Sequence, residues 1–427
     1  MRRVALLAAF AATIAAQPAA FAAPNIRYGI QDDAWLQFGA RSNQSLAKRL
    51  AILDRLGPDV VRYTLRWDEV ARKRPRRATN PNDKAYNWSG PDAILRGLRK
   101  HHIAALVTLY GSPKWANGRR APNSVPLSRW TLASFAVAAA KRYPWVRMWE
   151  IWNEPNLRTF LRPNSPSLYV RRLLNPTVAA LHRLRHGLRV AGGATSPRPT
   201  PSGIGPVEFM RGMRDAHARF DVYSHHPYPV SRFETPSRVS CRYCKGILTL
   251  ARLPDLLKEV RRDFGAKRIW LTEYGYQTNP PDRYLGVLPT LQARYLAQAA
   301  YLAYRAPSVD LLVHFLVRDE RSAGRWQSGL FTIGGAPKPA FQAFAIPLVQ
   351  LSRQGRRTVL WGQVRPRRGR QPYALQRVVD GRWRSVAGTR WTSTRGYFQR
   401  VVSVPSGARF RVLALRDRSR SLTLVVR

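Results

Sequence analysis

Two kinds of segment, which differ in the pattern of their apolar and polar positions, alternate along most of the chain. Between about residues 26 and 350, short runs rich in β-branched and aromatic residues are followed by longer segments with helical periodicity. This order is typical of βαβ units and predicts a parallel sheet covered by helices. The expected strands are Ile26–Ile30, Val60–Leu65, Ile103–Tyr110, Val146–Trp152, Leu188–Gly192, Phe220–Ser224, Arg268–Glu273 and Leu311–Val317.

The longer segments predict the helices between these strands. They are Gln44–Leu56, Pro91–His101, Leu127–Tyr143, Ser167–Arg185, Leu250–Phe264 and Leu288–Tyr304. Ser128 and Ser167 are expected to cap helix starts, and Gly57 and Gly265 to end helices. Eight alternations favour an α/β fold of the closed (β/α)8 TIM barrel type over an open doubly wound sheet. No G-x-G-x-x-G follows the first strand, so a dinucleotide-binding fold is not indicated.

The pattern changes after Leu351, where helical periodicity ends. Short apolar runs there are separated by Gly, Pro, Ser and Asp, at the spacing of a β-sandwich. The expected strands are Thr358–Val364, Tyr373–Val379, Trp383–Ala387, Gly396–Val404, Phe410–Leu415 and Leu422–Val426. We therefore predict a barrel at residues 24–350 and a small all-β sandwich, an accessory domain, at residues 351–427.

The first 23 residues have the layout of a secretory signal peptide. Two arginines precede an apolar, alanine-rich run from Val4 to Ala16, and small residues around Ala22 fit a cleavage site. The run is shorter than the roughly 20 residues that a membrane span needs, and no comparable run follows. The sequence predicts a secreted, extracellular protein without a membrane span. An uncleaved leader that holds the chain at the membrane is the alternative.

The chain carries a formal net charge of +48. Residues 351–427 contain 19 basic and 2 acidic residues, a net charge of +17. Such a field attracts polyanions, including an anionic cell envelope, acidic polysaccharide or nucleic acid. The excess is spread over the whole chain, whereas nucleic-acid modules usually concentrate it on one face, so no specific nucleic acid is expected. A compositional bias toward arginine explains the scattered excess equally well.

The two cysteines are Cys241 and Cys244, spaced C-x-x-C. An exported chain meets an oxidising compartment, which favours a local disulfide between them. A metal half-site or a thioredoxin-like redox pair is the alternative. No second Cys/His pair at ligand spacing follows, so no metal site is expected.

Two carboxylates end predicted strands at the same end of the barrel. Catalytic groups of (β/α)8 barrels lie at the carboxyl ends of the strands. The fourth strand leads into Glu154 and the seventh ends in Glu273, so the two side chains leave the barrel nearly opposite each other. Glycoside cleavage needs such a pair, one protonated and one ionised. Trp149 and Trp152 flank the first site and can raise a carboxyl pKa by desolvation or stack on a sugar ring.

Each carboxylate also has a structural interpretation. Glu154 precedes Pro155, and a carboxylate is favourable near a helix N-terminus. Glu273 could instead pair with one of the many arginines. The joint placement of the two on strands four and seven favours the catalytic interpretation.

The segment W-N-E-P-N at residues 152–156 resembles the clan A glycoside hydrolases, most closely family 39, with family 5 as its neighbour. The resemblance covers roughly residues 26–350. It implies that Glu154 is the general acid/base and Glu273 the nucleophile. It further implies a retaining double displacement that uses neither metal nor organic cofactor.

Further positions match the clan less specifically. Asn153 corresponds to the asparagine that binds the sugar 2-hydroxyl, and Arg62 to the strand-two arginine that holds the nucleophile ionised. His226 and Tyr228 resemble the strand-six pair that lines the sugar site, and Trp115 a tryptophan that forms a subsite wall. Arg62 could also be a plain surface charge, the histidine a structural residue and Trp115 a core residue.

The predicted strand eight departs from the clan pattern. In the clan, strand eight commonly ends in a tryptophan beneath the sugar, whereas this chain has Phe315 at that point. Phe315 could stack in its place, and Trp326 could reach in from the following loop. The segment Lys338–Phe341 resembles the opening of the clan's last helix.

The sequence therefore predicts a secreted retaining glycoside hydrolase that acts on a β-linked polysaccharide or oligosaccharide. A carbohydrate is the expected partner, and an anionic cell envelope is a second one. A carbohydrate- or cell-wall-binding protein on a degenerate, non-catalytic barrel is the alternative function.

Overall fold

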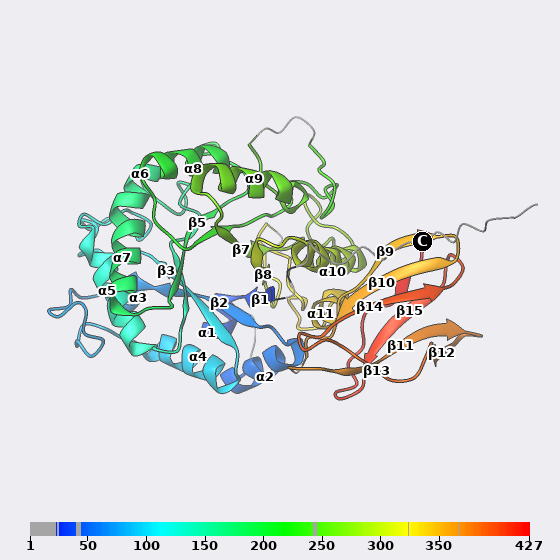
Figure 1. Ribbon diagram of the computed structural model, residues 1–427. Helices are drawn as coiled ribbons and strands as arrows, with labels where there is room; N and C mark the ends of the chain where they lie inside the picture. Colours follow the sequence, from blue (N-terminus) through cyan, green and yellow to red (C-terminus); the bar gives the residue numbers. More distant parts are fainter. Residues whose placement is uncertain (1–22, 24, 40–43, 242–245, 323, 367) are drawn as a thin grey trace, which may run out of the picture.

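The computed structural model describes residues 23, 25–39, 44–241, 246–322, 324–366 and 368–427. The expected signal peptide lies outside these residues, except for Ala23. The predicted barrel is present: eight parallel strands close in sequence order, and the last pairs with the first (Figure 1). The strands are β1 Arg27–Gln31, β2 Val60–Arg66, β3 Ala104–Tyr110, β4 Met148–Ile151, β5 Arg189–Thr195, β6 Val222–His225, β7 Arg268–Tyr274 and β8 Val309–Phe315.

Helices surround this barrel (Figure 1). They are α1 Asp33–Phe38, α2 Leu46–Leu56, α3 Trp67–Val70, α4 Ser89–Lys100, α5 Trp130–Arg142, α6 Pro166–Leu168, α7 Asn175–Leu184, α8 Pro206–Asp215, α9 Leu253–Phe264, α10 Pro289–Arg305 and α11 Pro339–Ala345, with a π-helical turn Tyr169–Leu174 between α6 and α7 and a short 3-10 turn Leu250–Arg252 before α9. Of the helices within the described residues, none is both long and apolar enough to cross a membrane.

The predicted helix ends are partly right. Gly57 and Gly265 follow the last residues of α2 and α9 with positive φ, which glycine adopts without strain. The predicted starts are wrong by one or two residues. Ser165, not Ser167, accepts a hydrogen bond from the Leu168 amide at the start of α6. At α5, the residue before the first helical one is Arg129, but the Ser128 hydroxyl one position earlier still accepts a hydrogen bond from the Trp130 amide at 3.3 Å.

The half of the barrel interior at the amino-terminal ends of the strands is apolar. Strand residues that point inward make a separate cluster there: Val60, Leu106, Met148, Ala191, Val222, Trp270, Leu311 and Val313. Because this plug fills the amino-terminal half, a polar group inside the barrel can reach solvent only at the carboxyl ends of the strands. Those ends are therefore the place for a site.

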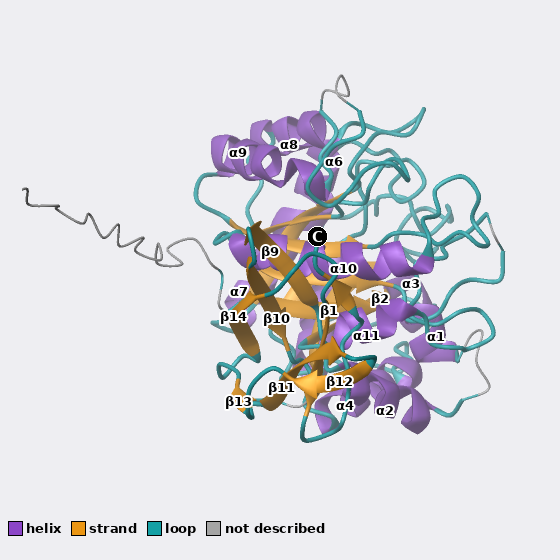
Figure 2. Ribbon diagram, turned by 90° about the vertical axis from the view of Figure 1, so that its right-hand side faces the viewer, coloured by secondary structure: helices purple, strands orange, loops and turns teal. Residues whose placement is uncertain are grey.

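The C-terminal part is all-β, as expected, and consists of two antiparallel sheets (Figure 2). One sheet has the order β14-β10-β9, and the other β12-β11-β15-β16, with β13 paired to β11. The strands are β9 Leu348–Gln354, β10 Arg357–Gln363, β11 Pro372–Val379, β12 Arg382–Ser385, β13 Arg390–Trp391, β14 Tyr397–Ser403, β15 Arg409–Ala414 and β16 Leu424–Val425. An apolar cluster with residues from both sheets forms its core. β9 and the two-residue β13 were not expected from the sequence.

Aromatic contacts join this β domain to the barrel, beside α10 and α11 (Figure 1). The Trp361 ring of β10 is 98 % buried and lies 5.2 and 5.4 Å from Tyr301 and Tyr304 of α10. The Arg365 guanidinium lies 3.9 Å from the ring centre of Tyr28 on β1 and donates to the Phe344 carbonyl. The two parts therefore share an apolar interface.

Candidate active site

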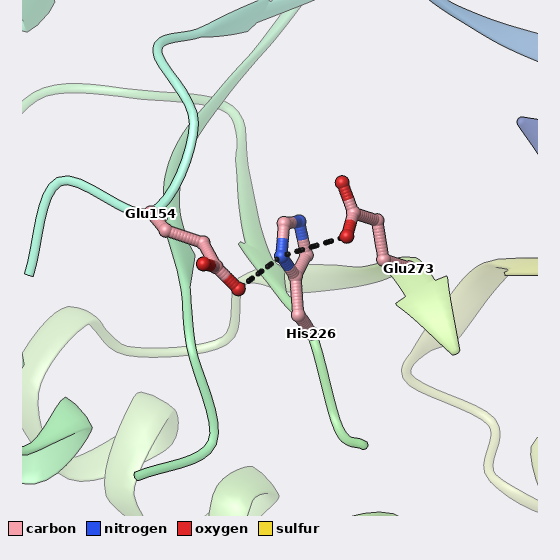
Figure 3. Close-up of side chains that lie close together, drawn as sticks. All are labelled: Glu154, His226 and Glu273. Carbon is pink, nitrogen blue, oxygen red and sulfur yellow. Dashed lines mark hydrogen bonds and ion pairs between the residues drawn. The ribbon is translucent and has the colours of Figure 1, made fainter. Parts of the chain in front are cut away.

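Glu154 and Glu273 lie at the carboxyl end of the barrel and face each other across one cleft (Figure 3). Glu273 is the next-to-last residue of β7, and Glu154 follows β4 by three residues. The cleft has a volume of about 710 Å³, and Asn153, Tyr228 and Phe315 also line it. Both carboxylates are about nine-tenths buried yet still reach the cleft. Their placement is the one that the strand ends predicted.

The backbone that carries Glu154 is held in a strained conformation. Trp152 has φ 74° and Glu154 has φ 39°, in the left-handed region that residues with a side chain rarely adopt. The Trp152 amide donates to the Leu109 carbonyl of β3, and the Glu154 amide to the Ala194 carbonyl of β5. The neighbouring strands thus hold the turn that aims this carboxylate into the cleft.

Arg62, on β2, organises the floor of the site and is completely buried. Its guanidinium donates to Glu273 Oε1 at 2.5 Å, Gln31 Oε1 at 2.6 Å, Glu150 Oε2 at 2.7 Å and Asn153 Oδ1 at 2.8 Å. The fork geometry of arginine suits such a cluster of acceptors. Arg62 is therefore not a surface charge; it lies beneath the cleft and positions both the carboxylate of β7 and the asparagine beside Glu154.

Two side chains that follow β6 join the carboxylates. The Tyr228 hydroxyl donates to Glu273 Oε2 at 2.9 Å. His226 Nδ1 lies 2.9 Å from Glu154 Oε1 and 3.6 Å from Glu273 Oε2 (Figure 3). One oxygen of each glutamate and the imidazole nitrogen all lie within 4.8 Å of one another. His225 turns away, since its ring nitrogens contact Thr195 and the Leu248 carbonyl.

The two carboxyl groups have different electrostatic surroundings. Burial raises the pKa of Glu154 well above its ordinary value, and the nearby Glu273 charge raises it further. Burial also raises the pKa of Glu273, but the Arg62 charge and the Tyr228 hydroxyl oppose this by stabilising the ionised form. Burial and the Arg62 charge lower the pKa of His226 well below its ordinary value, so its ring is neutral. This arrangement favours a proton on Glu154 and a negative charge on Glu273.

Aromatic rings form one wall of the cleft. The Tyr228 ring lies 4.6 Å from Trp326 and 6.2 Å from Phe315, and Phe315 meets Trp326 edge to face at 5.4 Å. Phe315 ends β8, and Trp326 reaches the cleft from the following loop. The two residues thus line the position where the clan commonly has a tryptophan.

Two tryptophans predicted to bind substrate do not reach the cleft. Trp152 is fully buried, and its indole donates to the Phe160 carbonyl at 2.7 Å. The Trp115 indole donates to the Ala71 carbonyl and packs edge to face on Trp67, 5.7 Å away. The predictions were wrong because a tryptophan at a strand end can point either into the cleft or behind it. Trp152 instead packs against Tyr110, 4.9 Å away between ring centres, and neither ring lines the cleft.

Sequence reasoning predicted the contact of Arg62 with Glu273 but missed two other partners, Glu150 and Gln31. Glu150 is fully buried within β4, and its Oε2 accepts from Arg62 and from Thr108. Gln31 ends β1 and also accepts from the guanidinium. A signal was present, because a charged residue in the middle of an otherwise apolar strand needs a buried partner of opposite charge. That rule would have linked Glu150 to the arginine of β2.

The cluster of Glu154, His226 and Glu273 also has the residue types of a metal site. However, the oxygen atoms that would bind a metal already accept hydrogen bonds. Both oxygens of Glu273 already accept from cationic or hydroxyl donors, and the Arg62 charge lies next to them. A cation at this point would have to replace the Tyr228 hydroxyl and face the guanidinium, so the donor set fits proton transfer better than metal binding.

The predicted disulfide stays a prediction. Cys244 lies outside the described residues, so the structure does not test its pairing with Cys241.

Comparisons with known proteins give a match at the level of fold. No protein-family model and no curated protein matches the sequence. Among solved structures, a family 39 glycoside hydrolase from Bacteroides cellulosilyticus WH2 is 17 % identical with a TM-score of 0.57, covering 90 % of this chain and 79 % of that one. A glucosidase from Croceicoccus marinus is 13 % identical with a TM-score of 0.58, covering 88 % and 94 %. A β-glucosidase from Exiguobacterium marinum is 13 % identical with a TM-score of 0.51, covering 75 % and 96 %.

These neighbours establish the architecture. The chain has the closed (β/α)8 barrel found in glycoside hydrolases, with a β domain attached, and the expected resemblance to clan A and family 39 is confirmed as a likeness of fold. At such identities the likeness does not assign an activity, because one fold hosts many functions. The activity must be argued from the site.

Proposed function

We propose that the protein is a retaining glycoside hydrolase in which Glu154 is the general acid/base and Glu273 the nucleophile. The pairing of the two carboxylates supports this most strongly. Their nearest oxygens are at most 4.8 Å apart in one open cleft. Retaining enzymes have carboxyl groups roughly 5–5.5 Å apart, whereas inverting enzymes need roughly 6.5–9.5 Å to admit a water molecule. The short separation favours retention.

The first step of the proposed reaction forms a covalent intermediate. Glu273 attacks the anomeric carbon while the Glu154 carboxyl gives its proton to the glycosidic oxygen, and the bond from that oxygen to the carbon breaks. The raised pKa of Glu154 keeps the proton available. Arg62 and Tyr228 hold the Glu273 oxygens in position for attack.

The second step returns the enzyme to its starting state. The Glu154 carboxylate, now ionised, takes a proton from water, and the water oxygen attacks the anomeric carbon. The ester bond to Glu273 breaks, and the product keeps the original anomeric configuration. Asn153, held by Arg62 Nη2, lines the cleft and is placed to bind the sugar 2-hydroxyl.

The proposed substrate is a β-linked polysaccharide or oligosaccharide outside the cell. The cleft of about 710 Å³ and its wall of Tyr228, Phe315 and Trp326 support a carbohydrate, because aromatic faces pack well on pyranose rings. The leader-like first 23 residues support secretion, and the net charge of +48 supports attraction to an anionic cell envelope.

The test is a comparison of variants on a panel of xylans, glucans, mannans and acidic exopolysaccharides. Glu273→Gln should lose at least about a thousandfold in kcat, because no nucleophile remains. Glu154→Ala should lose much less activity on aryl glycosides with good leaving groups than on polysaccharides. Azide should partly restore its activity by attacking the glycosyl intermediate without a general base.

The control is Glu208→Gln, which changes an exposed glutamate on α8 outside the cleft. It should keep wild-type activity. Glycan turnover that survives Glu273→Gln would rule out the proposed nucleophile. Glycan binding without turnover by the wild-type protein across the panel would support the non-catalytic alternative.

A further inference from the structure

The sheet of β11, β12, β13, β15 and β16 has one face packed on the core of the β domain and one outer face. Tyr373 and Leu375 of β11 enter the apolar cluster, so by alternation Pro372, the small buried Ala374, Gln376 and Val378 point to the outer face. Trp391 pairs with Pro372, and Trp383 pairs with Val378. Both tryptophans are therefore on the outer face, roughly 20 Å apart along the strand.

Arginines accompany both tryptophans. Arg411 pairs with Gln376 on the same face and donates to its Oε1 at 2.8 Å. Its guanidinium carbon lies 4.2 Å from the Trp383 ring centre. Arg370 and Arg416 lie 5.8 and 6.0 Å from the Trp391 ring, which is 49 % exposed. We call these five residues, Trp383, Trp391, Arg370, Arg411 and Arg416, the basic–aromatic face.

The positive charge of this face has little compensation. Residues 351–427 carry 19 basic and 2 acidic side chains. Within the described residues, the ion pair of this domain joins Arg395 to Asp59 of the barrel and does not involve the basic–aromatic face. The pKa of Arg411 is lowered by burial and by the neighbouring Arg420 charge. A bound anion would relieve this repulsion.

The chemistry of the face matches one kind of ligand. An indole ring stacks on the apolar face of a pyranose, and a guanidinium held against an aromatic ring presents its donors in the plane that a carboxylate needs. The cleft also offers two arginines to such a ligand: Arg198 and Arg325 line it beside its acidic residues, are exposed and make no ion pair among the described residues. A polymer that carries both sugar rings and carboxylates would suit both places.

We infer that the basic–aromatic face is a binding site, separate from the cleft, for a carboxylate-bearing polysaccharide. The site would hold the polymer on the β domain while the barrel acts on it. The inference rests on the proposed function for the choice of a polysaccharide over another polyanion. The face itself is defined by its own residues, so its binding is measured without turnover.

The experiment measures binding of the full chain in a Glu273→Gln background, by titration calorimetry and affinity electrophoresis. The probes are polygalacturonate, alginate and hyaluronan, with highly methyl-esterified polygalacturonate as the matched neutral polymer. We expect binding that weakens with salt and that is lost when the carboxylates are esterified. Trp383→Ala combined with Trp391→Ala should weaken binding by about tenfold or more. Arg411→Gln combined with Arg416→Gln should weaken it similarly while leaving both indoles in place.

The control variant is Trp130→Ala. Trp130 is 55 % exposed and also has an arginine against its ring, Arg129 at 4.6 Å, but it lies on the barrel. It should bind all probes like the parent. The inference is overturned if no carboxylated polymer binds, if the esterified polymer binds equally, or if the tryptophan and arginine variants bind like Trp130→Ala. Tighter binding of single-stranded DNA or anionic vesicles that depends on the same residues would also overturn it. Hydrolysis data from the wild-type protein judge the proposed function separately.

Discussion

Among the described side chains of the site, Arg62 makes the most hydrogen bonds to other side chains. It is fully buried and donates to two carboxylates, Glu150 and Glu273, as well as to two amide oxygens. Removing one partner of a buried ion pair leaves the other charge uncompensated. The stability of the barrel and the ionisation of the proposed nucleophile therefore depend on the same group.

Arg62→Met tests this dependence. We expect the free energy of unfolding to fall by about 3–5 kcal/mol, because two buried carboxylates lose their countercharge. Arg189→Met is the control, since Arg189 pairs with Asp310 at a partly exposed position and such pairs contribute about 0–1 kcal/mol. Urea unfolding followed by circular dichroism measures both. Equal losses in the two variants would contradict the role given to Arg62.

The pH dependence of kcat/KM follows from the two carboxyl groups. Activity should fall as the pH drops through the pKa of Glu273, which must be ionised, and as it rises through the pKa of Glu154, which must be protonated. The Tyr228 hydroxyl lowers the pKa of Glu273, so Tyr228→Phe should move the acidic limb to higher pH by roughly one unit. Tyr110→Phe, at another tyrosine of the cleft, should leave that limb in place. An unmoved acidic limb in Tyr228→Phe would show that another group controls it.

At the scale of a single residue, the sequence predicted which carboxylates lie at the cleft better than it predicted which way the tryptophan side chains point. Strand ends placed Glu154 and Glu273 on one cleft because every parallel strand delivers its last residues to the same edge. The same argument failed for Trp115 and Trp152. Which side of a strand-end loop a ring occupies depends on its packing partners, such as Trp67, which are distant in sequence.

At the scale of elements, a bulge at the end of β5 supports the strained turn of Glu154. The pairing of β5 with β6 shifts register between Gly193 and Thr195. Gly193 has φ 103°, and the next residue, Ala194, supplies the carbonyl that receives the Glu154 amide. A Cβ at Gly193 would come within 2.7 Å of the Tyr223 ring and 2.8 Å of the Ser224 carbonyl oxygen. The bulge thus requires glycine.

Gly193→Ala should therefore reduce both stability and kcat. We expect about 1–3 kcal/mol of destabilisation from overpacking, in addition to the conformational cost, because backbone lies on the other side of the contact. Gly187→Ala is the matched control: Gly187 also has a positive φ of 75° but no atom within 4 Å of the added Cβ. Only the first variant should lose activity. An active Gly193→Ala enzyme would show that the bulge does not hold Glu154.

The elements themselves were largely predictable, for a physical reason. Each barrel strand is a short run of buried β-branched and aromatic residues bounded by polar turns, so its position is visible in sequence. β9 was missed because Leu348–Gln354 has only its first residue buried and follows a helix directly. Its strand conformation comes from pairing with β10, which local sequence does not encode.

At the scale of the whole molecule, the barrel and the β domain share a buried interface. Trp361 packs on two tyrosines of α10, and Arg365 lies between the rings of Tyr28 and Phe344. Inter-domain contacts of this kind, apolar and well packed, make two parts of a chain unfold together. We therefore expect one cooperative unfolding transition for the full chain.

Trp361→Ala should disrupt this coupling. Replacing a buried tryptophan by alanine typically removes about 3–5 kcal/mol, and here the loss falls on the interface itself. Calorimetry should show a lower Tm and a transition that splits in two. Trp391→Ala, in an exposed position of the same domain, should change the Tm little. A single unshifted transition in Trp361→Ala would mean that the interface contributes little to stability.

The account as a whole depends on Glu273 acting as a covalent nucleophile. Incubation with a panel of activated 2-deoxy-2-fluoro glycosides should trap the glycosyl ester. The fluorine slows both steps, and the activated leaving group restores the rate of the first step alone, so the ester accumulates. Tryptic digestion and mass spectrometry should then find the added sugar on the peptide of residues 269–283, at Glu273. A sugar attached to a different residue, or turnover of these glycosides with no labelled peptide, would contradict the account.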